Sequence, residues 1–145
     1  MFWIFAGVIL AADRVLKNYI DAHFLLHESQ PLIDGLISLL YVQNKGAAFS
    51  MLSGQRWFLL AVALVTVGGI LYYRYRFKPQ KQMNMALGCI VGGAVGNMID
   101  RFLYGYVIDY VSIGWWPVFN LADVAIVCGG AWLFLLILLS KEEKE

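Results

Sequence analysis

The stretch that decides the fold runs from Leu121 to Ser140 and reads LADVAIVCGGAWLFLLILLS. Between Val124 and Leu139 it carries no charged residue. A helix needs roughly 17–25 predominantly apolar residues to cross a bilayer, so this stretch is long enough to span one. It therefore predicts a membrane protein, and it places an acidic residue, Asp123, at the start of the span.

Three further apolar stretches have similar lengths. The chain is 61% hydrophobic and 14% charged, with a mean hydropathy of +0.68, whereas soluble domains average about 25% charged residues. The formal net charge of +1 gives no electrostatic basis for binding nucleic acid. We predict an all-α integral membrane protein of one domain, 1–145, whose four transmembrane helices cover approximately residues 2–20, 57–73, 83–102 and 121–140.

Basic residues predict how the chain is oriented in the membrane. Lys and Arg favour cytoplasmic loops, and the short link between the second and third spans carries four of them: Arg74, Arg76, Lys78 and Lys81. With four spans, both termini share the side of this link. We therefore expect cytoplasmic termini, with segments 21–56 and 103–120 on the extracytoplasmic face.

The extracytoplasmic segment 21–56 is too long for a bare connector. His23–Glu28 is predicted to form a short interfacial helix, which Pro31 ends. Leu36–Val42 is rich in Leu, Ile, Tyr and Val and is predicted to be extended. Asn44-Lys45-Gly46 then supplies a turn. We expect a small β-element on the outer face of the membrane.

Two aspartates stand out in these apolar surroundings. Asp109 lies within Val107–Val111, and Asp123 opens the last span. A carboxylate at the centre of a membrane helix costs about 2.5–3.5 kcal/mol, so such residues tend to be functional. Helix capping is an alternative role for Asn120 or Asp123, but it does not account for Asp109. The pair is therefore a candidate site for acid–base chemistry.

The third span carries a stripe of small residues, with Gly88, Gly92 and Gly96 at four-residue spacing. Such a stripe lets a neighbouring helix approach closely. Packing is the favoured interpretation of this stripe.

Polar residues gather at the end of the third span and in the first. Asn97 and Asp100 are three residues apart, so they share one face of the helix, and Arg101 follows them. Together they form a polar cluster at the outer end of the span. In the first span, Asp13 and Lys17 are four residues apart. They are predicted to form a salt bridge, to support a site, or to do both.

Other chemistries find less support in the sequence. His23 and His27 are four residues apart but lack a third convincing ligand, so we expect no metal and no cofactor. Cys89 and Cys128 lie in apolar runs, where free cysteines pack as small hydrophobic residues. Carboxylates remain the candidates for chemistry.

Several motifs occur in order along the chain. They are Asp13-x-x-x-Lys17, NKGAAF at 44–49, GGAVGNMIDR at 92–101, VIDY at 107–110 and FNLAD at 119–123. Together they resemble the bacterial lipoprotein signal peptidases, or signal peptidase II family, over nearly the whole chain. Each motif alone is weak, but their order is specific.

The resemblance implies a monomeric inner-membrane aspartyl endopeptidase with an extracytoplasmic β-cradle. Its substrate would be a diacylglyceryl-modified prolipoprotein, cleaved just before the lipidated cysteine. The enzyme would be in contact with membrane lipids. Globomycin-type peptides would inhibit it. By motif position, the resemblance implies that Asp109 and Asp123 are the catalytic pair. It implies substrate-binding or supporting roles for Asn44, Gly46, Asn97, Arg101, Asn120, Asp13 and Asp100.

Two alternatives to a protease stay open from the residues themselves. A small ion or proton transporter also carries intramembrane acids, although Asp100, Asp109 and Asp123 gather toward one face rather than the midplane. A non-catalytic helical scaffold would use its polar groups only to join helices.

Overall fold

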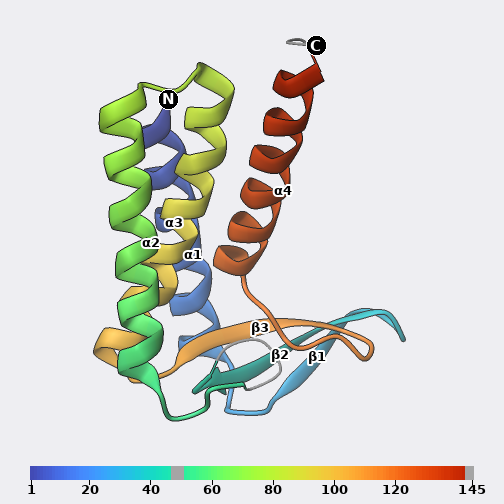
Figure 1. Ribbon diagram of the computed structural model, residues 1–145. Coiled ribbons are helices and arrows are strands. Elements are labelled where there is room, and N and C mark those ends of the chain that lie inside the picture. The colour runs from blue at the N-terminus through green and yellow to red at the C-terminus, as the bar shows by residue number, and fades with distance from the viewer. Residues whose placement is uncertain (47–50, 143–145) are drawn as a thin grey trace.

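The computed structural model describes residues 1–46 and 51–142, and it contains four long helices and one small sheet (Figure 1). Ala47–Phe49, the second half of the NKGAAF motif, lie outside the described residues. The elements in chain order are α1 Phe2–His23, β1 Ser29–Ile33, β2 Ile37–Asn44, α2 Arg56–Phe77, α3 Lys81–Leu103, β3 Val107–Ile113 and α4 Leu121–Glu142.

Three helices in the described part of the chain are long and apolar enough to cross a membrane. They are α2, α3 and the Leu121–Leu139 portion of α4. The first helix, α1, has 22 residues and is also long enough. It differs from the other three in carrying charged residues near its middle, namely Asp13, Arg14 and Lys17.

The glycine stripe of α3 packs against α1, as predicted. A Cβ atom on Gly88 would lie 2.6 Å from the carbonyl oxygen of Phe2, and one on Gly92 would lie 2.6 Å from that of Ala6. These separations leave no room for any side chain. The two backbones therefore approach closely along the first half of α1, and α3 becomes the central helix of the bundle.

The opposite side of α3 packs against α4 through further glycines. A Cβ atom on Gly93 would collide with the carbonyl oxygen of Ala122, and one on Gly129 would lie 2.9 Å from that of Ala86. Helix α2 also packs against α3. Because α3 contacts the other three helices, its polar C-terminal end lies close to all of them.

The strands form an antiparallel sheet in the order β1-β2-β3. The sheet lies across the end of the bundle that is opposite both termini (Figure 1). This confirms the predicted β-element, and β1 is an edge strand that accommodates Pro31. The pairing of Val42 with Asp109 places β3, which the sequence did not predict as a strand, beside β2.

The interfacial helix expected at 23–28 is replaced by a turn. The backbone N–H of Glu28 donates to the carbonyl oxygen of Leu25 at 2.8 Å, and the Glu28 carboxylate accepts from the N–H of Leu25. The backbone groups of His27 and Glu28 pair with Tyr41 of β2. These residues thus extend the sheet, and the backbone bonds that a helix would need are already used.

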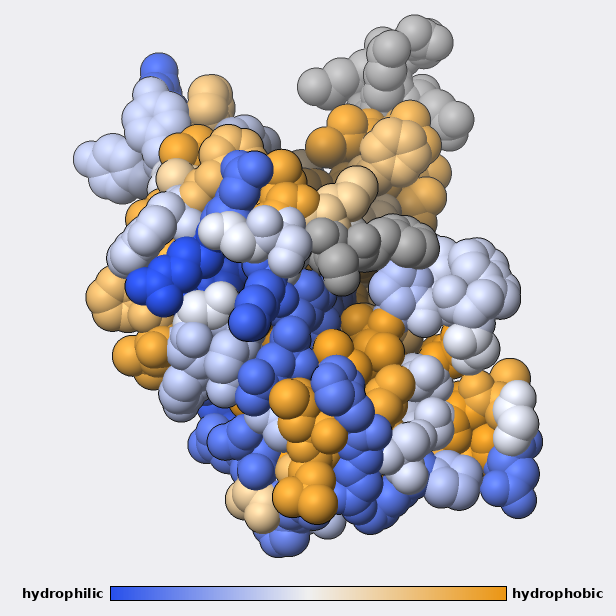
Figure 2. Space-filling model, turned by 90° about the horizontal axis from the view of Figure 1, so that it is seen from below, coloured by the Kyte–Doolittle hydropathy of each residue, from blue (hydrophilic) through white to orange (hydrophobic). Residues whose placement is uncertain are grey.

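A small apolar cluster joins the sheet to the helices. It contains Ile20, Phe24, Tyr41, Ile108 and Tyr110, all of which are buried. Seen from the sheet end, the surface carries hydrophilic residues over much of its centre with apolar residues between them (Figure 2). The cluster fixes β3 against the bundle, so the position of Asp109 is defined by the core.

Candidate active site

Asp109 lies in the middle of β3 and is 2% exposed. Its Oδ2 accepts a hydrogen bond from Asn44 Nδ2 at 2.9 Å, and its Oδ1 accepts one from Asn120 Nδ2 at 2.7 Å. Burial raises the pKa of Asp109 to about 7, and the negative charge of Asp123 adds to the rise. Near neutral pH this carboxyl group can therefore hold or release a proton.

Asp123 lies in the first turn of α4. Its Oδ1 accepts from Asn97 Nδ2 at 2.8 Å, and its Oδ2 accepts from the backbone N–H of Asn120 at 3.2 Å. In return, the Asn120 side-chain oxygen accepts from the backbone N–H of Asp123 at 2.9 Å. The helix-capping role considered from the sequence is thus present, and it orients the Asp123 carboxylate at the same time.

Asn120 links the two aspartates. Its side-chain nitrogen donates to Asp109, and its backbone nitrogen donates to Asp123. The same side-chain nitrogen also lies 3.2 Å from Asn97 Oδ1 and 3.3 Å from the carbonyl oxygen of Ile108. A single buried residue thus fixes the two carboxyl groups relative to each other, although they come from a strand and a helix.

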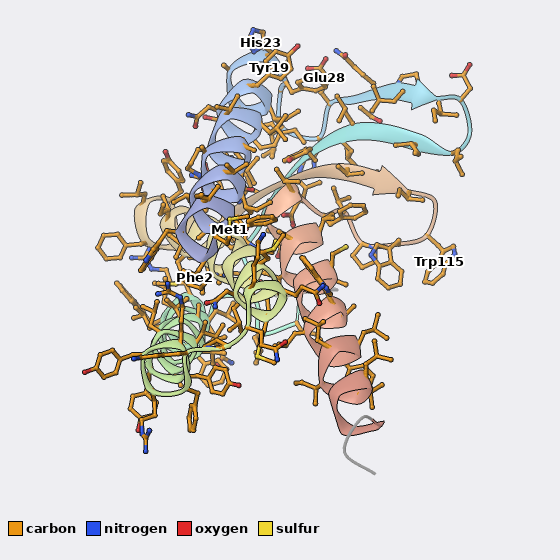
Figure 3. All side chains as sticks on the ribbon, turned by 90° about the horizontal axis from the view of Figure 1, so that it is seen from above. Met1, Phe2, Tyr19, His23, Glu28 and Trp115 are labelled. Atoms are coloured by element: carbon orange, nitrogen blue, oxygen red, sulfur yellow. The ribbon has the colours of Figure 1, made fainter. Side chains whose placement is uncertain are left out.

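Both carboxyl groups line one cavity of about 230 Å³. Asn44 and Arg101 supply its other polar walls, and the loop 116–119 with Ile126 and Val127 supplies apolar ones. An adjoining cavity of about 530 Å³ shares Asn44 and Asp109 and opens toward β2 and Trp115. In Figure 3, Trp115 projects from the loop between β3 and α4, away from the helices.

A third cavity extends from the site between the helices. Its volume is about 280 Å³, and it shares Asn97, Arg101 and Asp123 with the site. The rest of its lining is mostly apolar and comes from α2, α3 and α4, including Leu59 and Ile90. The carboxyl pair thus lies between a polar opening at the sheet and an apolar groove among the helices.

Arg101 and Gly46 connect the end of α3 to the end of β2. Arg101 Nη2 donates to the carbonyl oxygen of Gly46 at 3.1 Å, and the N–H of Gly46 donates to Asn44 Oδ1 at 2.9 Å. Because its oxygen is held by Gly46, the Asn44 amide presents its nitrogen to Asp109. Both residues named from the motifs therefore lie beside the cavity.

Next to the aspartates lies a cluster of four charged side chains, the ionic quartet Asp13, Arg14, Lys17 and Asp100. Its members are fully buried except Arg14, whose side chain is 22% exposed. Lys17 Nζ lies 2.9 Å from both Asp13 Oδ2 and Asp100 Oδ2. Arg14 Nη2 lies 2.7 Å from Asp100 Oδ1 and 3.2 Å from Asp13 Oδ2. The two positive and two negative charges balance. The predicted salt bridge between Asp13 and Lys17 is present.

The quartet also holds the backbone on either side of the aspartates. Asp13 Oδ1 accepts from the N–H of Ala122 at 3.2 Å, and Asp100 Oδ2 accepts from the N–H of Ile108 at 3.3 Å. Each acid therefore contacts the residue that immediately precedes Asp123 or Asp109. The motif resemblance predicted supporting roles for Asp13 and Asp100. It predicted no such role for Lys17 or Arg14, although Lys17 has helical spacing from Asp13.

A bundle of apolar helices that buries two linked carboxyl groups in a cavity defines a membrane-embedded protein built for acid–base chemistry. The family described as "Signal peptidase (SPase) II" matches residues 5–139. The curated "Lipoprotein signal peptidase" of Syntrophomonas wolfei is 45% identical over 144 residues, covering 99% of this chain and 97% of that protein. The one from Desulfitobacterium hafniense is 43% identical over 147 residues, covering 100% and 97%.

A solved structure has the same fold as this chain. It is described as a bacterial membrane enzyme determined by the in meso method at 2.3 Å resolution, and it superposes with a TM-score of 0.94 at 25% identity. The superposition covers 98% of this chain and 90% of that one. The chain belongs to the signal peptidase II family. It is a multi-pass membrane protein and a protease, which confirms the resemblance seen in its motifs.

Proposed function

We propose that this protein removes the signal peptide from bacterial prolipoproteins by hydrolysing the peptide bond before a diacylglyceryl-modified cysteine. Its family and its relatives named lipoprotein signal peptidase support this activity, and they give no support to the transporter alternative. The observation that carries the proposal is the linkage of Asp109 and Asp123 through Asn120 at one cavity.

Asp109 and Asp123 act as the catalytic pair. Two neighbouring carboxyl groups cannot both ionise at low cost, so they share one proton. The ionised member takes a proton from water, which attacks the scissile carbonyl, while the protonated member donates to the carbonyl oxygen. A proton then passes to the departing amine. Assistance of this kind typically contributes about 10²–10⁴-fold in rate. The pair titrates as a unit, so the resting proton belongs to both aspartates.

The other polar groups at the cavity bind the substrate backbone. Substrate amides at membrane depth need hydrogen-bond partners, because hydrocarbon offers none. Asn44 and Arg101 both line the cavity beside the aspartates and can supply such partners. The apolar groove among α2, α3 and α4 suits the hydrocarbon chains of the lipidated cysteine. A globomycin-type peptide would compete for the same space.

The topology follows from α1 acting as a fourth span. Its charged residues Asp13, Arg14 and Lys17 are paired within the ionic quartet, which offsets the cost of placing them in the membrane. Both termini then lie at the end that carries the basic α2–α3 link, away from the sheet (Figure 1). This arrangement supports cytoplasmic termini in the inner membrane and an extracytoplasmic active site. Since one chain supplies all the site residues, we expect a single monomeric domain surrounded by lipid.

The test is cleavage by the purified protein in lipid of two prolipoprotein substrates that differ only in the diacylglyceryl group on the cysteine. We expect cleavage of the modified substrate alone, before the cysteine, and inhibition by globomycin. Equal cleavage of both substrates would contradict the assigned specificity. Absence of cleavage together with a proton flux in liposomes would instead favour a transporter.

A further inference from the structure

Lys17 is a fully buried lysine whose three N–H donors meet three acceptors. Its ammonium lies 2.9 Å from carboxylate oxygens of Asp13 and Asp100, and it donates to Asn97 Oδ1 at 2.8 Å. Its side chain is 0% exposed. The two carboxylates would be sufficient to compensate its charge. The third bond is the only one of these three that reaches out of the ionic quartet, and it ends on a residue that contacts Asp123.

This third bond fixes which way the Asn97 amide points. An ammonium can only donate, so the amide oxygen must face Lys17. The Asn120 side-chain nitrogen, also a donor, lies 3.2 Å from the same oxygen. The Asn97 nitrogen is consequently turned toward Asp123, and it donates to Oδ1 at 2.8 Å. With Asn97 only 5% exposed, water offers little alternative to these partners.

We propose that Lys17 is a positioning residue for the catalytic pair, which acts by holding the Asn97 amide in the one orientation that donates to Asp123. This inference rests on the proposed function of Asp109 and Asp123. Lys17 stays outside the cavity and does not contact the substrate. Lys17 positions the pair through Asn97, and its positive charge also lowers the pKa of Asp109 directly.

Loss of Lys17 would leave only the longer bond from Asn120 to hold the Asn97 oxygen, so the amide could turn over more easily. In the flipped orientation the Asn97 oxygen faces Asp123, and that contact is favourable only while the carboxyl group carries a proton. The pair would then keep its proton to higher pH and position it less well. The charged groups around Asn97 are Asp13, Arg14 and Lys17 from α1, Asp100 and Arg101 from α3, Asp109 from β3 and Asp123 from α4.

The neighbouring Arg14 provides a matched control. It belongs to the same quartet and carries the same charge, and its further hydrogen bond goes to the carbonyl oxygen of Gly96 at 3.4 Å. None of the hydrogen bonds and ion pairs that Arg14 makes within residues 1–46 and 51–142 goes to Asn97. Arg14→Met and Lys17→Met thus remove equal charge from one cluster, but only the second substitution removes the bond to the amide.

The experiment measures kcat and KM against pH for both variants with a diacylglyceryl-modified prolipoprotein. We expect Lys17→Met to lower kcat by roughly 100-fold, the scale that a small misplacement of catalytic groups carries, and to move the alkaline limb of the profile to higher pH. Arg14→Met should lower kcat much less than Lys17→Met does, and its profile should stay close to that of the unaltered protein, because the bond to the Asn97 amide is kept. Equal losses and equal profiles in the two variants would overturn the proposal.

A double-substitution cycle with Asn97→Ala separates positioning from general support. If Lys17 acts through Asn97, Lys17→Met should lower kcat little further once Asn97 is alanine, because the amide that it positions is gone. Additive losses in the double variant would overturn the proposal. This cycle does not depend on the quartet alone, since Asn97→Ala leaves all four charges in place.

Two measurements keep the result interpretable. Thermal unfolding in detergent is recorded for every variant, and Lys17→Met combined with Asp13→Asn restores charge balance if the single variant does not fold. The balanced variant should show the same low kcat and the same shift in profile, and a normal kcat would overturn the proposal. If the unaltered protein fails to cleave the substrate, the proposed function fails; if it cleaves and the cycle is additive, only the role of Lys17 fails.

Discussion

Asn44 at the end of β2 donates a 2.9 Å hydrogen bond to Asp109 of β3, although the two residues are 65 positions apart in the chain. The bond crosses the sheet and is supported by the register in which Asn44 pairs with Val107. A carboxylate that accepts an amide N–H is stabilised in its ionised form. Asn44 therefore opposes the burial that raises the pKa of Asp109.

The first prediction follows from this bond. Asn44→Ala should raise the pKa of Asp109 further, because the donor to its ionised form is lost and burial is unopposed at that oxygen. The alkaline limb of the pH–rate profile should move to higher pH. Gln43→Ala is the matched control, since the Gln43 side chain donates to the Tyr41 hydroxyl and not to Asp109. The same profile for both variants would argue against the role of Asn44.

The second prediction concerns the unaltered protein. With the pKa of Asp109 at about 7, the shared proton is held below this pH and is lost as the pH rises through it. Because hydrolysis needs one protonated and one ionised carboxyl group, kcat/KM should decline above about pH 7. A pH–rate profile on lipidated substrate measures this, and a rate that stays constant to pH 9 would contradict a shared proton.

The third prediction is that Asp109→Asn and Asp123→Asn each abolish cleavage while the protein still inserts and folds. An amide keeps the size of the carboxyl group but cannot take up the proton from water. Product formation on gels reports activity, and size-exclusion chromatography in detergent reports folding. A folded variant that cleaves at a near-normal rate would remove that aspartate from the catalytic pair.

The fourth prediction separates binding from chemistry. Arg101→Ala should raise KM or weaken inhibitor binding, because it removes a polar wall of the cavity and the bond to the Gly46 carbonyl oxygen. Titration with a globomycin-type peptide measures the change in affinity. An unchanged affinity in a folded Arg101→Ala protein would exclude Arg101 from the binding surface.

The fifth prediction tests the close approach of α1 and α3. Gly92→Ala would place a Cβ 2.6 Å from the Ala6 carbonyl oxygen, so the helices must separate, at a cost of about 1–3 kcal/mol in stability. Gly68→Ala in α2 is the control, because nothing lies within 4 Å of its added Cβ. Thermal unfolding should show a lower midpoint for Gly92→Ala only. Equal midpoints would mean that the helices can separate freely.

The sequence predicted the long elements well, because an apolar run of membrane length has few alternative structures. The expected span 57–73 lies within α2, Arg56–Phe77, and the helix extends beyond the apolar run because Arg74 and Arg76 continue it. The strand β3 was not predicted, since apolar residues lie on both faces of the run Val107–Val111 without regular alternation, and its partner lies far earlier in the chain. The turn at Glu28 was missed because its backbone partner, Tyr41, is also distant.

The sequence could predict which residues belong to the candidate site, but it could not predict the hydrogen bonds that connect them. Motif order indicated Asp109, Asp123 and their polar neighbours. The spacing of Asp13 and Lys17 indicated a salt bridge within α1 and gave no sign of the bond from Lys17 to Asn97, which is 80 positions away. Contacts between helices depend on how the bundle packs, and residue spacing along one helix does not contain that information.

The division of the aspartates between β3 and α4 has a consequence for how the protein matures. α4 emerges after β3 during synthesis, and it delivers both Asp123 and the Ala122 N–H that Asp13 binds. A nascent chain that extends only to the end of β3 holds Asp109 and lacks Asp123, so it has one of the two proposed catalytic aspartates. With the proposed roles of Asp109 and Asp123, we expect proteolysis to begin only after α4 has docked against α1 and α3.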